Sequence, residues 1–352
     1  MSVYALWNNK GGVGKSYLTF QIASEYARTH PDEKVLVIDL CPQANASGML
    51  LGGIIKGEKN LVEIATAPAR KTIAGYIEQR VSSPYVSPKV GGSYVTLPHD
   101  YNRSIPKNLH LVVGDEALEI QASRVANAMR PGPTDAWRIV HTWISDLIAD
   151  IIDSWNGEET TIFIDCNPSF SVYTELALSA ADKLIIPFSA DGSSKRAVRA
   201  VISLLYGITR VKGAEQSEFF LNTTRFRMAR PKIYAYVGNR MTQMNSSSAA
   251  AFKTVVNEIG KEIWNVYIAQ PGNFAIHPSG SPAPSTPTEF RRMFQAEIND
   301  ANSASVVSGG LGIPISTLSA GSKTLAGKSI QVNQSQLDKQ QPNLRRFVAT
   351  IE

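Results

Sequence analysis

The sequence predicts a three-layer α/β domain, in which helices cover both faces of a mostly parallel sheet. Two observations carry this prediction. Short apolar runs of strand-forming residues recur along the chain, and amphipathic stretches with helical spacing lie between them. Two such strands joined by one helix pair in parallel through a right-handed crossover. With 352 residues, 43% of them apolar, the chain can bury a large core, which excludes wholesale disorder.

The expected elements alternate in chain order. Their apolar patterns place strands at 3–7, 34–39, 161–165, 183–187 and 232–238, and helices at about 18–26, 137–155, 172–181, 195–208 and 249–263. Residues 53–108 read as irregular, with Gly, Pro and Ser in their second half, and 271–287 as a proline-rich loop or lid. We therefore expect one domain over residues 1–352, with insertions at about 53–108 and 271–310.

Composition excludes several classes of protein. Two cysteines cannot form a disulfide framework or a four-cysteine metal site. The chain shows neither a basic leader followed by an apolar stretch nor a run of about 18 apolar residues. The sequence thus predicts a soluble cytoplasmic protein. Its net charge of +5 permits a polyanionic partner without requiring one.

A glycine-rich loop separates the first strand from the first helix. It reads Lys10-Gly11-Gly12-Val13-Gly14-Lys15-Ser16, and it differs from the general phosphate loop because Asn9 stands where that loop has its first glycine. Glycines let backbone N–H groups close around phosphate oxygens, and the following helix directs its positive end toward them. Lys15 would then reach the β and γ phosphates, and the Ser16 hydroxyl would bind Mg²⁺. The plainer interpretation is a glycine turn before a helix.

This loop resembles the deviant phosphate loop K-G-G-x-G-K-S/T of the ParA/MinD family of P-loop ATPases. Other segments resemble family patterns in the same order: 37–47 (D-x-D-P-Q-x-N-x-S/T), 164–169 (I-D-x-P-P-S), 184–187 (the strand before the second switch), 237–240 (the strand end at the adenine) and 313–316 (V-P-x-S). The resemblance runs from residue 3 to about 316 and is nearest to the ParA-type partition ATPases. It implies the P-loop NTPase fold, ATP or ADP as ligand, and Mg²⁺.

The resemblance also implies roles for single residues. Lys10 would be the signature lysine, which reaches the partner's phosphates across a nucleotide-sandwich homodimer and stabilises the transferring phosphoryl group. The catalytic set would be Lys10, Lys15 and Asp39, and the metal set Ser16, Asp39 and Asp165. Nucleotide would contact Lys10, Gly11, Gly12, Val13, Gly14, Lys15, Ser16, Tyr17, Asn239 and Arg240, with Asn239 at the adenine edge. The plainer interpretations are a solvated loop lysine for Lys10, a helix-capping carboxylate for Asp165 and a turn residue for Asn239.

One departure concerns catalysis. In the family's D-x-D pattern the second aspartate positions the attacking water, and this chain has Cys41 there. A neutral thiol orients water poorly, so we expect an intact ATP and Mg²⁺ site with slow turnover unless another residue substitutes. Tyr17 stands where the family usually has threonine, which is a smaller change.

Positive charge is concentrated after the presumed second switch. Nine basic residues oppose two acidic ones between Lys195 and Lys232, a net charge of +7. The candidate DNA-binding residues are Lys195, Arg196, Arg199, Arg225, Arg227 and Arg230; Arg210 and Lys212 belong to the same segment. A solvated basic face explains the charge equally well. The resemblance favours DNA binding without sequence preference by an ATP-bound dimer.

The leading functional hypothesis is a nucleoid-associated partition ATPase that positions a plasmid, chromosome or other cargo, with a ParB-like or other adaptor protein. A MinD-like membrane-associated ATPase is an alternative, for which the short segment 344–351 would have to act as an amphipathic anchor. A nucleotide-locked scaffold without efficient hydrolysis is another. An iron–sulfur reductase is disfavoured because Cys41 and Cys166 both lie inside nucleotide motifs.

Overall fold

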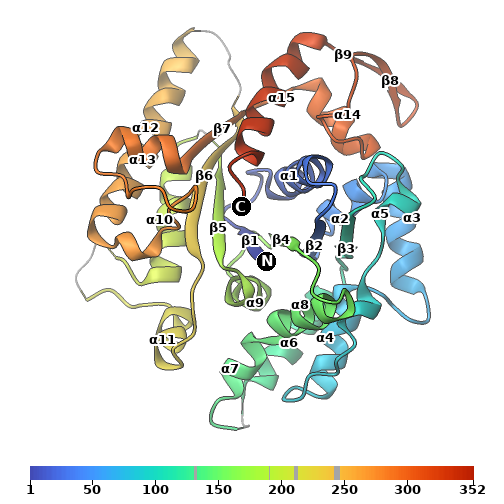
Figure 1. Ribbon diagram of the computed structural model, residues 1–352, viewed down its shortest axis with the longest axis vertical. Helices are drawn as coiled ribbons and strands as arrows, with labels where there is room; N and C mark the ends of the chain where they lie inside the picture. The colour runs from blue at the N-terminus through green and yellow to red at the C-terminus, as the bar shows by residue number, and fades with distance from the viewer. Residues whose placement is uncertain (131–132, 190, 210–212, 242–245) are drawn as a thin grey trace.

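A seven-stranded sheet forms the centre of the computed structural model, which describes residues 1–130, 133–189, 191–209, 213–241 and 246–352, without the side chains of 240, 241 and 246–252. The strand order is β3-β2-β4-β1-β5-β6-β7, and every pair in it is parallel (Figure 1). The strands are β1 (Ser2–Leu6), β2 (Lys34–Leu40), β3 (Leu109–Val112), β4 (Thr160–Cys166), β5 (Lys183–Phe188), β6 (Lys232–Met241) and β7 (Gln295–Asn299). The predicted three-layer P-loop NTPase fold is confirmed.

Helices cover both faces of this sheet, because strand side chains alternate between two apolar cores. In β1, Val3 and Ala5 face the first core, and Tyr4 and Leu6 face the second. The elements between and after the strands are α1 (Lys15–Thr29), α2 (Asn45–Leu50), α3 (Gly53–Thr66), α4 (Ile73–Ser82), η1 (Gly91–Tyr94), α5 (Pro98–Tyr101), α6 (Leu118–Ala128), α7 (Ala136–His141), α8 (Trp143–Ser154), α9 (Val172–Ala180), α10 (Ser194–Tyr206), α11 (Glu218–Arg225), α12 (Ser246–Ala269), η2 (Pro271–Asn273), α13 (Pro287–Phe294), α14 (Ser303–Leu311), the antiparallel pair β8 (Gly321–Leu325) and β9 (Lys328–Val332), and α15 (Gln334–Val348).

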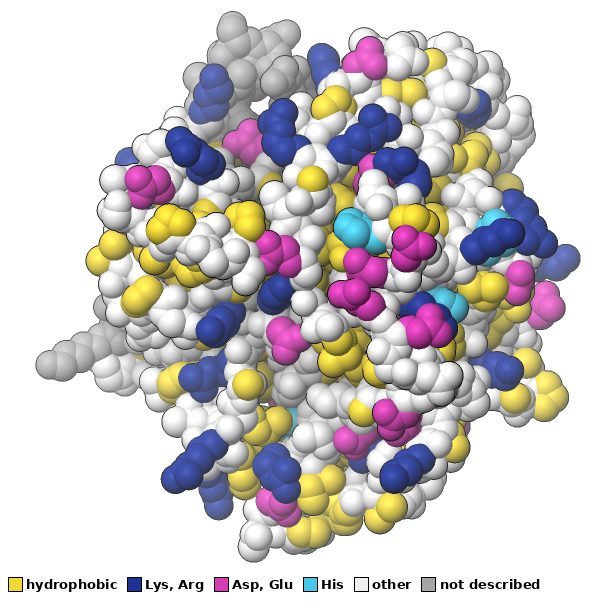
Figure 2. Space-filling view, viewed as in Figure 1, with side chains coloured by type: hydrophobic (Ala, Val, Ile, Leu, Met, Phe, Trp, Pro, Cys, Tyr) yellow, Lys and Arg dark blue, Asp and Glu magenta, His cyan; other side chains and the backbone are white. Residues whose placement is uncertain are grey.

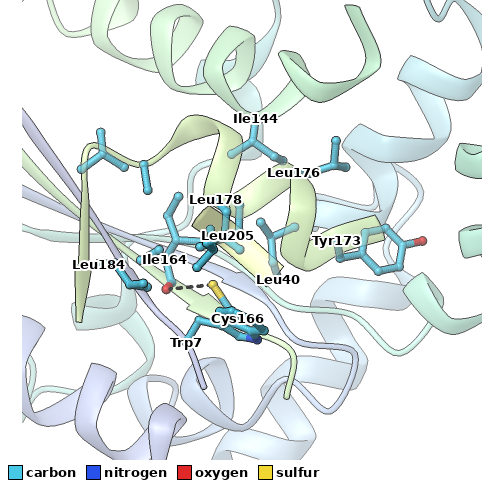
Figure 3. Close-up of a cluster of buried hydrophobic side chains, with 14 of the residues drawn as sticks. Trp7, Leu40, Ile144, Ile164, Cys166, Tyr173, Leu176, Leu178, Leu184 and Leu205 are labelled. Atoms are coloured by element: carbon cyan, nitrogen blue, oxygen red, sulfur yellow. Dashed lines mark hydrogen bonds between the residues drawn. The ribbon is translucent and has the colours of Figure 1, made fainter. Parts of the chain in front are cut away.

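The first core lies directly behind the strand ends that form the candidate site. Trp7, Leu40 and Cys166 meet there at the ends of β1, β2 and β4, against side chains of α8, α9 and α10 (Figure 3). All three are buried, with exposed fractions of 1% or less. This packing fixes the ends of the three strands that carry the phosphate loop, Asp39 and Asp165.

The segment 53–108 corrects the expectation of irregular structure. It contains helices α3 and α4, the short η1 and the single-turn α5. The helix expected over 137–155 is present but is interrupted at Thr142, which separates α7 from α8. The interruption at Thr142 is a local break that apolar periodicity does not specify.

The proline-rich segment after α12 is a loop that packs on the domain. Phe274 pairs with Ile233 of β6 as an isolated bridge, and the His277 ring lies 2.9 Å from the Tyr234 carbonyl oxygen. The Tyr267 hydroxyl donates to the Pro284 carbonyl at 3.1 Å. The following residues supply α13, the edge strand β7 and α14, so the interval 271–310 contributes directly to the central sheet.

Candidate nucleotide-binding site

The phosphate loop lies between the carboxyl end of β1 and the start of α1, where parallel sheets bind ligands. Gly12 and Gly14 have φ values of 76° and 78°, in the left-handed region that glycine adopts without strain. Gly14 is the residue before α1, which begins at Lys15. Backbone N–H groups at this helix start can therefore face an anion, as the sequence predicts.

A cavity of about 610 Å³ opens beside this loop. Gly12, Gly14, Lys15, Ser16 and Tyr17 form part of its wall. Four other lining residues lie inside the motif segments 37–47 and 164–169 but were not named as site residues: Gln43, Asn45, Asn167 and Pro168. Further lining residues lie outside every motif: Met49, Ile54, Glu119, Ser305 and Val306. This volume is typical of small-molecule sites.

Lys15 is buried in the loop that it follows. Its Nζ donates to the Asn8 carbonyl at 3.3 Å and to the Lys10 carbonyl at 3.0 Å. Burial lowers the pKa of Lys15, and the nearby Asp165 acts in the opposite direction. The ammonium group thus stands at the centre of the loop, where it can meet phosphate oxygens.

Asp39 and Asp165 lie at the ends of neighbouring strands and are both fully buried. Asp39 is held by its own strand–helix connection, because it accepts hydrogen bonds from the Cys41 N–H at 3.1 Å, the Ser47 N–H at 2.9 Å and the Ser47 hydroxyl at 2.8 Å. Asp165 accepts from the Thr19 hydroxyl at 3.2 Å. Burial raises the pKa of both carboxyl groups, and for Asp165 the charge of Asp39 adds to the effect.

The donor set fits Mg²⁺ at Asp165 better than at Asp39. Among the described residues, the Asp165 Oδ2 atom is buried and has no hydrogen-bond partner. The Ser16 side chain is close enough to this carboxyl group to lower its pKa, so a hydroxyl and a carboxylate oxygen lie together next to the phosphate loop. Mg²⁺ prefers such oxygen ligands and keeps several waters. The predicted metal role of Asp39 stays a prediction, with both of its oxygens already hydrogen-bonded.

Both cysteines lie beside the predicted chemistry. Cys41 and Cys166 line the cavity and are free thiols. Burial, reinforced by the charges of Asp39 and Asp165, raises the pKa of Cys41 to about 12, so the thiol stays neutral at physiological pH. The Cys166 Sγ atom points toward the Ile164 carbonyl at 3.8 Å (Figure 3).

Lys10 reaches away from the loop to the residues that precede α10. Its Nζ lies 3.1 Å from the Ser189 hydroxyl and 3.4 Å from the Ser194 hydroxyl, and it forms an ion pair with Asp191. Burial acts to raise the pKa of Asp191, but hydrogen bonds from Lys10 and from Ser189 and Ser193 lower it well below its usual range. The predicted signature lysine therefore contacts the start of α10.

The residues expected at the adenine lie at the end of β6. Asn239 is fully buried, and its side-chain amide donates to the Val13 carbonyl at 3.0 Å and the Gly14 carbonyl at 3.2 Å. It thus braces the phosphate loop from β6, which lies two strands from β1 in the sheet, and its contact with adenine stays a prediction. The Arg240 side chain lies outside the described part of the chain. Tyr17 is 5% exposed and lines the cavity.

The predicted basic patch divides between two places. On α10, Lys195 pairs with Glu258 at 2.6 Å and Arg199 with Glu262 at 2.9 Å, both acidic partners coming from α12. Arg196 is exposed and has no ion pair within the described ranges. Two of the three basic residues of α10 are therefore neutralised by a helix that is distant in sequence.

Around α11 the arginines are partly engaged with aromatic rings. Arg230 lies 4.8 Å from the Phe220 ring centroid and donates to the Thr223 and Thr224 hydroxyls, while Arg225 lies 5.2 Å from the Phe226 ring. Arg225 and Arg227 are exposed. Arg210 and Lys212 fall outside the described residues. Basic and acidic side chains are interspersed over the face of the molecule in Figure 2.

Comparisons with known proteins agree with this geometry. A family model described as an AAA domain matches residues 1–99, the part that contains the phosphate loop and Asp39. The chromosome partitioning protein ParA of Caulobacter vibrioides is 26% identical over 268 residues, which cover 76% of this chain and 80% of the relative.

Solved structures show the same fold. An ATP complex of a McdA variant from Cyanothece has a TM-score of 0.57 at 14% identity and covers 100% of this chain and 98% of its own. The apo form of McdA gives a TM-score of 0.53 at 15% identity, with 89% and 91% covered. The chain thus shares the fold of the McdA structures and is similar in sequence to ParA, and both findings agree with the resemblance of its phosphate loop and strand-end segments to the ParA/MinD family of P-loop ATPases.

Proposed function

We propose that this protein is a partition or positioning ATPase that binds ATP with Mg²⁺, dimerises around the nucleotide and then holds DNA without sequence preference. The contact of Lys10 with the residues before α10 carries the proposal. Lys10 is the lysine expected to bind a partner's nucleotide. Through this contact it lies against α10, the helix that bears Lys195, Arg196 and Arg199. Nucleotide state and DNA binding can therefore be coupled through one side chain.

Nucleotide binding rests on the phosphate loop, with Lys15 and the N–H groups at the start of α1 facing the phosphates. Ser16 and Asp165 are the residues that would hold Mg²⁺, which neutralises developing charge on the phosphoryl oxygens. Thr19 orients the Asp165 carboxylate through its hydroxyl. Asn239 holds the loop through hydrogen bonds to the Val13 and Gly14 carbonyls.

Hydrolysis is expected to be slow. Cys41 occupies the place of a water-orienting carboxylate, and its neutral thiol is a poor substitute. Among the described residues that line the cavity, Glu119 of α6 is the single carboxylate. Glu119 is therefore the residue that could take over part of this role.

Dimerisation would require Lys10 to leave Asp191. The pair is partly exposed, with 23% of the Lys10 and 47% of the Asp191 side chain accessible, so it is weak enough to exchange for a phosphate. Once Lys10 leaves, Asp191 remains hydrogen-bonded to Ser193 at the start of α10. Movement of Lys10 from Asp191 to a phosphate would thus remove one contact that holds the start of α10 and its basic residues.

The membrane-associated alternative finds less support. The apolar residues of α15 and the chain end, including Leu344, Phe347, Val348 and Ile351, are buried against α1 and the sheet rather than presented to a bilayer. Within the described ranges, none of the helices combines the length and apolarity that a membrane crossing needs. A ParB-like or other adaptor and a nucleoid location in the cytoplasm are part of the proposal, through the relation to a chromosome partitioning protein.

Binding to random duplex DNA and to anionic liposomes, each with no nucleotide, ADP or ATP, tests the proposal. We expect ATP-dependent, salt-sensitive DNA binding and no liposome binding, because phosphate contacts release counterions. DNA binding that is equal in all three nucleotide states would contradict it. Liposome binding alone would support the membrane alternative, and binding to neither surface the scaffold.

A further inference from the structure

The far end of α1 forms one wall of a second cavity, remote from the nucleotide. This cavity has a volume of about 500 Å³. Arg28, which lines it, lies thirteen residues after Lys15 on the same helix, or about 20 Å along the axis. The other walls are the turn between α5 and β3 and the turn at residues 314–317. Of the segments that resemble family patterns, 313–316 reaches this cavity through Pro314 and Ser316, and the proposed nucleotide site does not use it.

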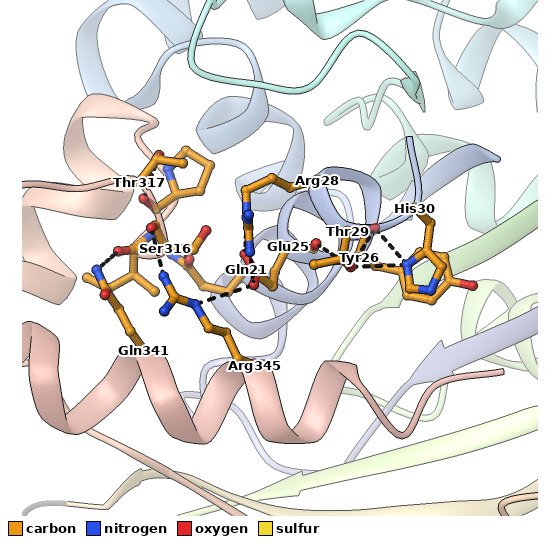
Figure 4. A network of polar contacts seen from close by, with 12 residues as sticks. Gln21, Glu25, Tyr26, Arg28, Thr29, His30, Ser316, Thr317, Gln341 and Arg345 are labelled. Atoms are coloured by element: carbon orange, nitrogen blue, oxygen red, sulfur yellow. Dashed lines mark hydrogen bonds and ion pairs between the residues drawn. The ribbon is translucent and has the colours of Figure 1, made fainter. Parts of the chain in front are cut away.

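The charged side chains that line this cavity are cationic. Arg28, Arg103 and Lys107 contribute cationic groups, and none of the described lining residues is acidic. The nearest carboxylate, Glu25, is fully buried and already engaged, since Arg28 binds it at 2.6 and 2.8 Å and Arg345 lies 3.6 Å away (Figure 4). Arg103 and Lys107 are exposed and form no ion pair in the described part of the chain. Two cationic groups therefore remain available to a ligand.

Hydroxyl groups complete the lining. Ser24 is 1% exposed and lines the cavity, yet its Oγ atom has no hydrogen-bond partner among the described residues. On the wall formed by the turn at residues 314–317, the buried Ser316 Oγ atom also has no hydrogen-bond partner among the described residues. Leaving buried hydroxyls unpaired is unfavourable, so a ligand that accepts hydrogen bonds would remove this cost.

Hydrogen bonds fix the backbone on both sides of this cavity. Asn108 donates to the carbonyls of Ala27, His30 and Glu33, which satisfies the end of α1. Gln341 of α15 donates to the Ile315 carbonyl at 2.8 Å and fixes the opposite turn (Figure 4). The cavity is thus held open by hydrogen bonds that do not use its free donors.

Guanidinium, ammonium and hydroxyl donors without a carboxylate match a phosphate group, which accepts several hydrogen bonds and carries up to two negative charges. We propose that this cavity binds a phosphate group, carried either by a small organic phosphate or by the DNA backbone. A small phosphorylated molecule would be an effector bound at the opposite end of α1 from the phosphate loop. A DNA phosphate would extend the DNA-binding surface beyond α10.

Titration of inorganic phosphate into the protein saturated with a non-hydrolysable ATP analogue, followed by calorimetry, separates this cavity from the phosphate loop, because the three phosphates of the analogue fill the nucleotide site. Binding to random duplex DNA is measured in parallel. We expect the double variant R103Q/K107Q to weaken one of the two interactions by roughly tenfold or more. The variant S24A should weaken the same interaction while leaving the fold intact.

The double variant K59Q/R130Q is the matched control, because it removes the same charge from exposed positions on α3 and after α6. Loss of phosphate binding in R103Q/K107Q but not in the control identifies a small phosphate as the ligand. Loss of DNA binding alone identifies the backbone. If both variants behave alike toward phosphate and toward DNA, the proposal is overturned, and the proposed ATPase function is unaffected.

Discussion

Asp39 and Asp165 are register partners at the carboxyl ends of the neighbouring strands β2 and β4. Two buried carboxyl groups at adjacent positions disfavour each other's charge, and burial raises the pKa of both. Their surroundings nevertheless differ. Asp39 is tied to Ser47, whereas Asp165 keeps one oxygen free next to the phosphate loop. The pair thus divides into Asp39, whose oxygens are both hydrogen-bonded, and Asp165, whose free oxygen we propose to face Mg²⁺.

The substitution Asp165→Asn tests this division. The variant should fold with equal or greater stability, since it removes a buried charge without changing volume. It should also lose the dependence of ATP binding on Mg²⁺. The measurement is the thermal shift produced by ATP with Mg²⁺ and with EDTA. A shift that still depends on Mg²⁺ as in the wild type would place the metal elsewhere.

The substitution Cys41→Asp restores the carboxylate that orients water. Steady-state ATP hydrolysis should rise by about a hundredfold or more, because a positioned general base contributes about 10²–10⁴-fold. Cys41→Ser, which is neutral and of similar size, serves as the control and should leave the rate unchanged. A wild-type rate already equal to that of Cys41→Asp would show that Glu119 or another group performs this function.

The substitution Asn239→Leu removes the donor that braces the phosphate loop. The buried carbonyls of Val13 and Gly14 would lose a partner, at a cost of about 1–3 kcal/mol in the free energy of unfolding. Affinity for ADP and for GDP should fall together if the side chain acts through the loop. A loss confined to ADP would instead show direct recognition of adenine.

The double substitution Glu258→Gln and Glu262→Gln releases Lys195 and Arg199 from α12. If α10 contacts DNA, affinity for duplex DNA in the presence of ATP should increase several-fold and its salt dependence should steepen. Arg196→Gln should act in the opposite direction. Fluorescence anisotropy over a range of salt concentrations measures both effects, and unchanged affinity in all variants would remove α10 from the DNA-binding surface.

Short-range patterns predicted the parts of the site that lie within one motif. The phosphate loop, the strand-end positions of Asp39 and Asp165 and the neutral Cys41 all follow from local sequence. Two other contacts join residues that are far apart in the chain: Lys195 with Glu258, and Asn239 with the phosphate loop. No local sequence pattern could predict these contacts. Helix α3 was missed because Ile54 and Ile55 are exposed, which obscures its apolar periodicity.

Sedimentation of the wild type and of Lys10→Ala, each with ADP and with ATP in the presence of Mg²⁺, tests most directly whether Lys10 couples ATP to dimerisation. The wild type should shift from monomer to dimer with ATP but not with ADP. Asp191→Asn should form the ATP-dependent dimer at a few-fold lower protein concentration, because it lacks the partly exposed ion pair that competes for Lys10. Lys10→Ala should bind ATP and stay monomeric. An ATP-dependent dimer of Lys10→Ala that is as stable as the wild-type dimer would contradict the account.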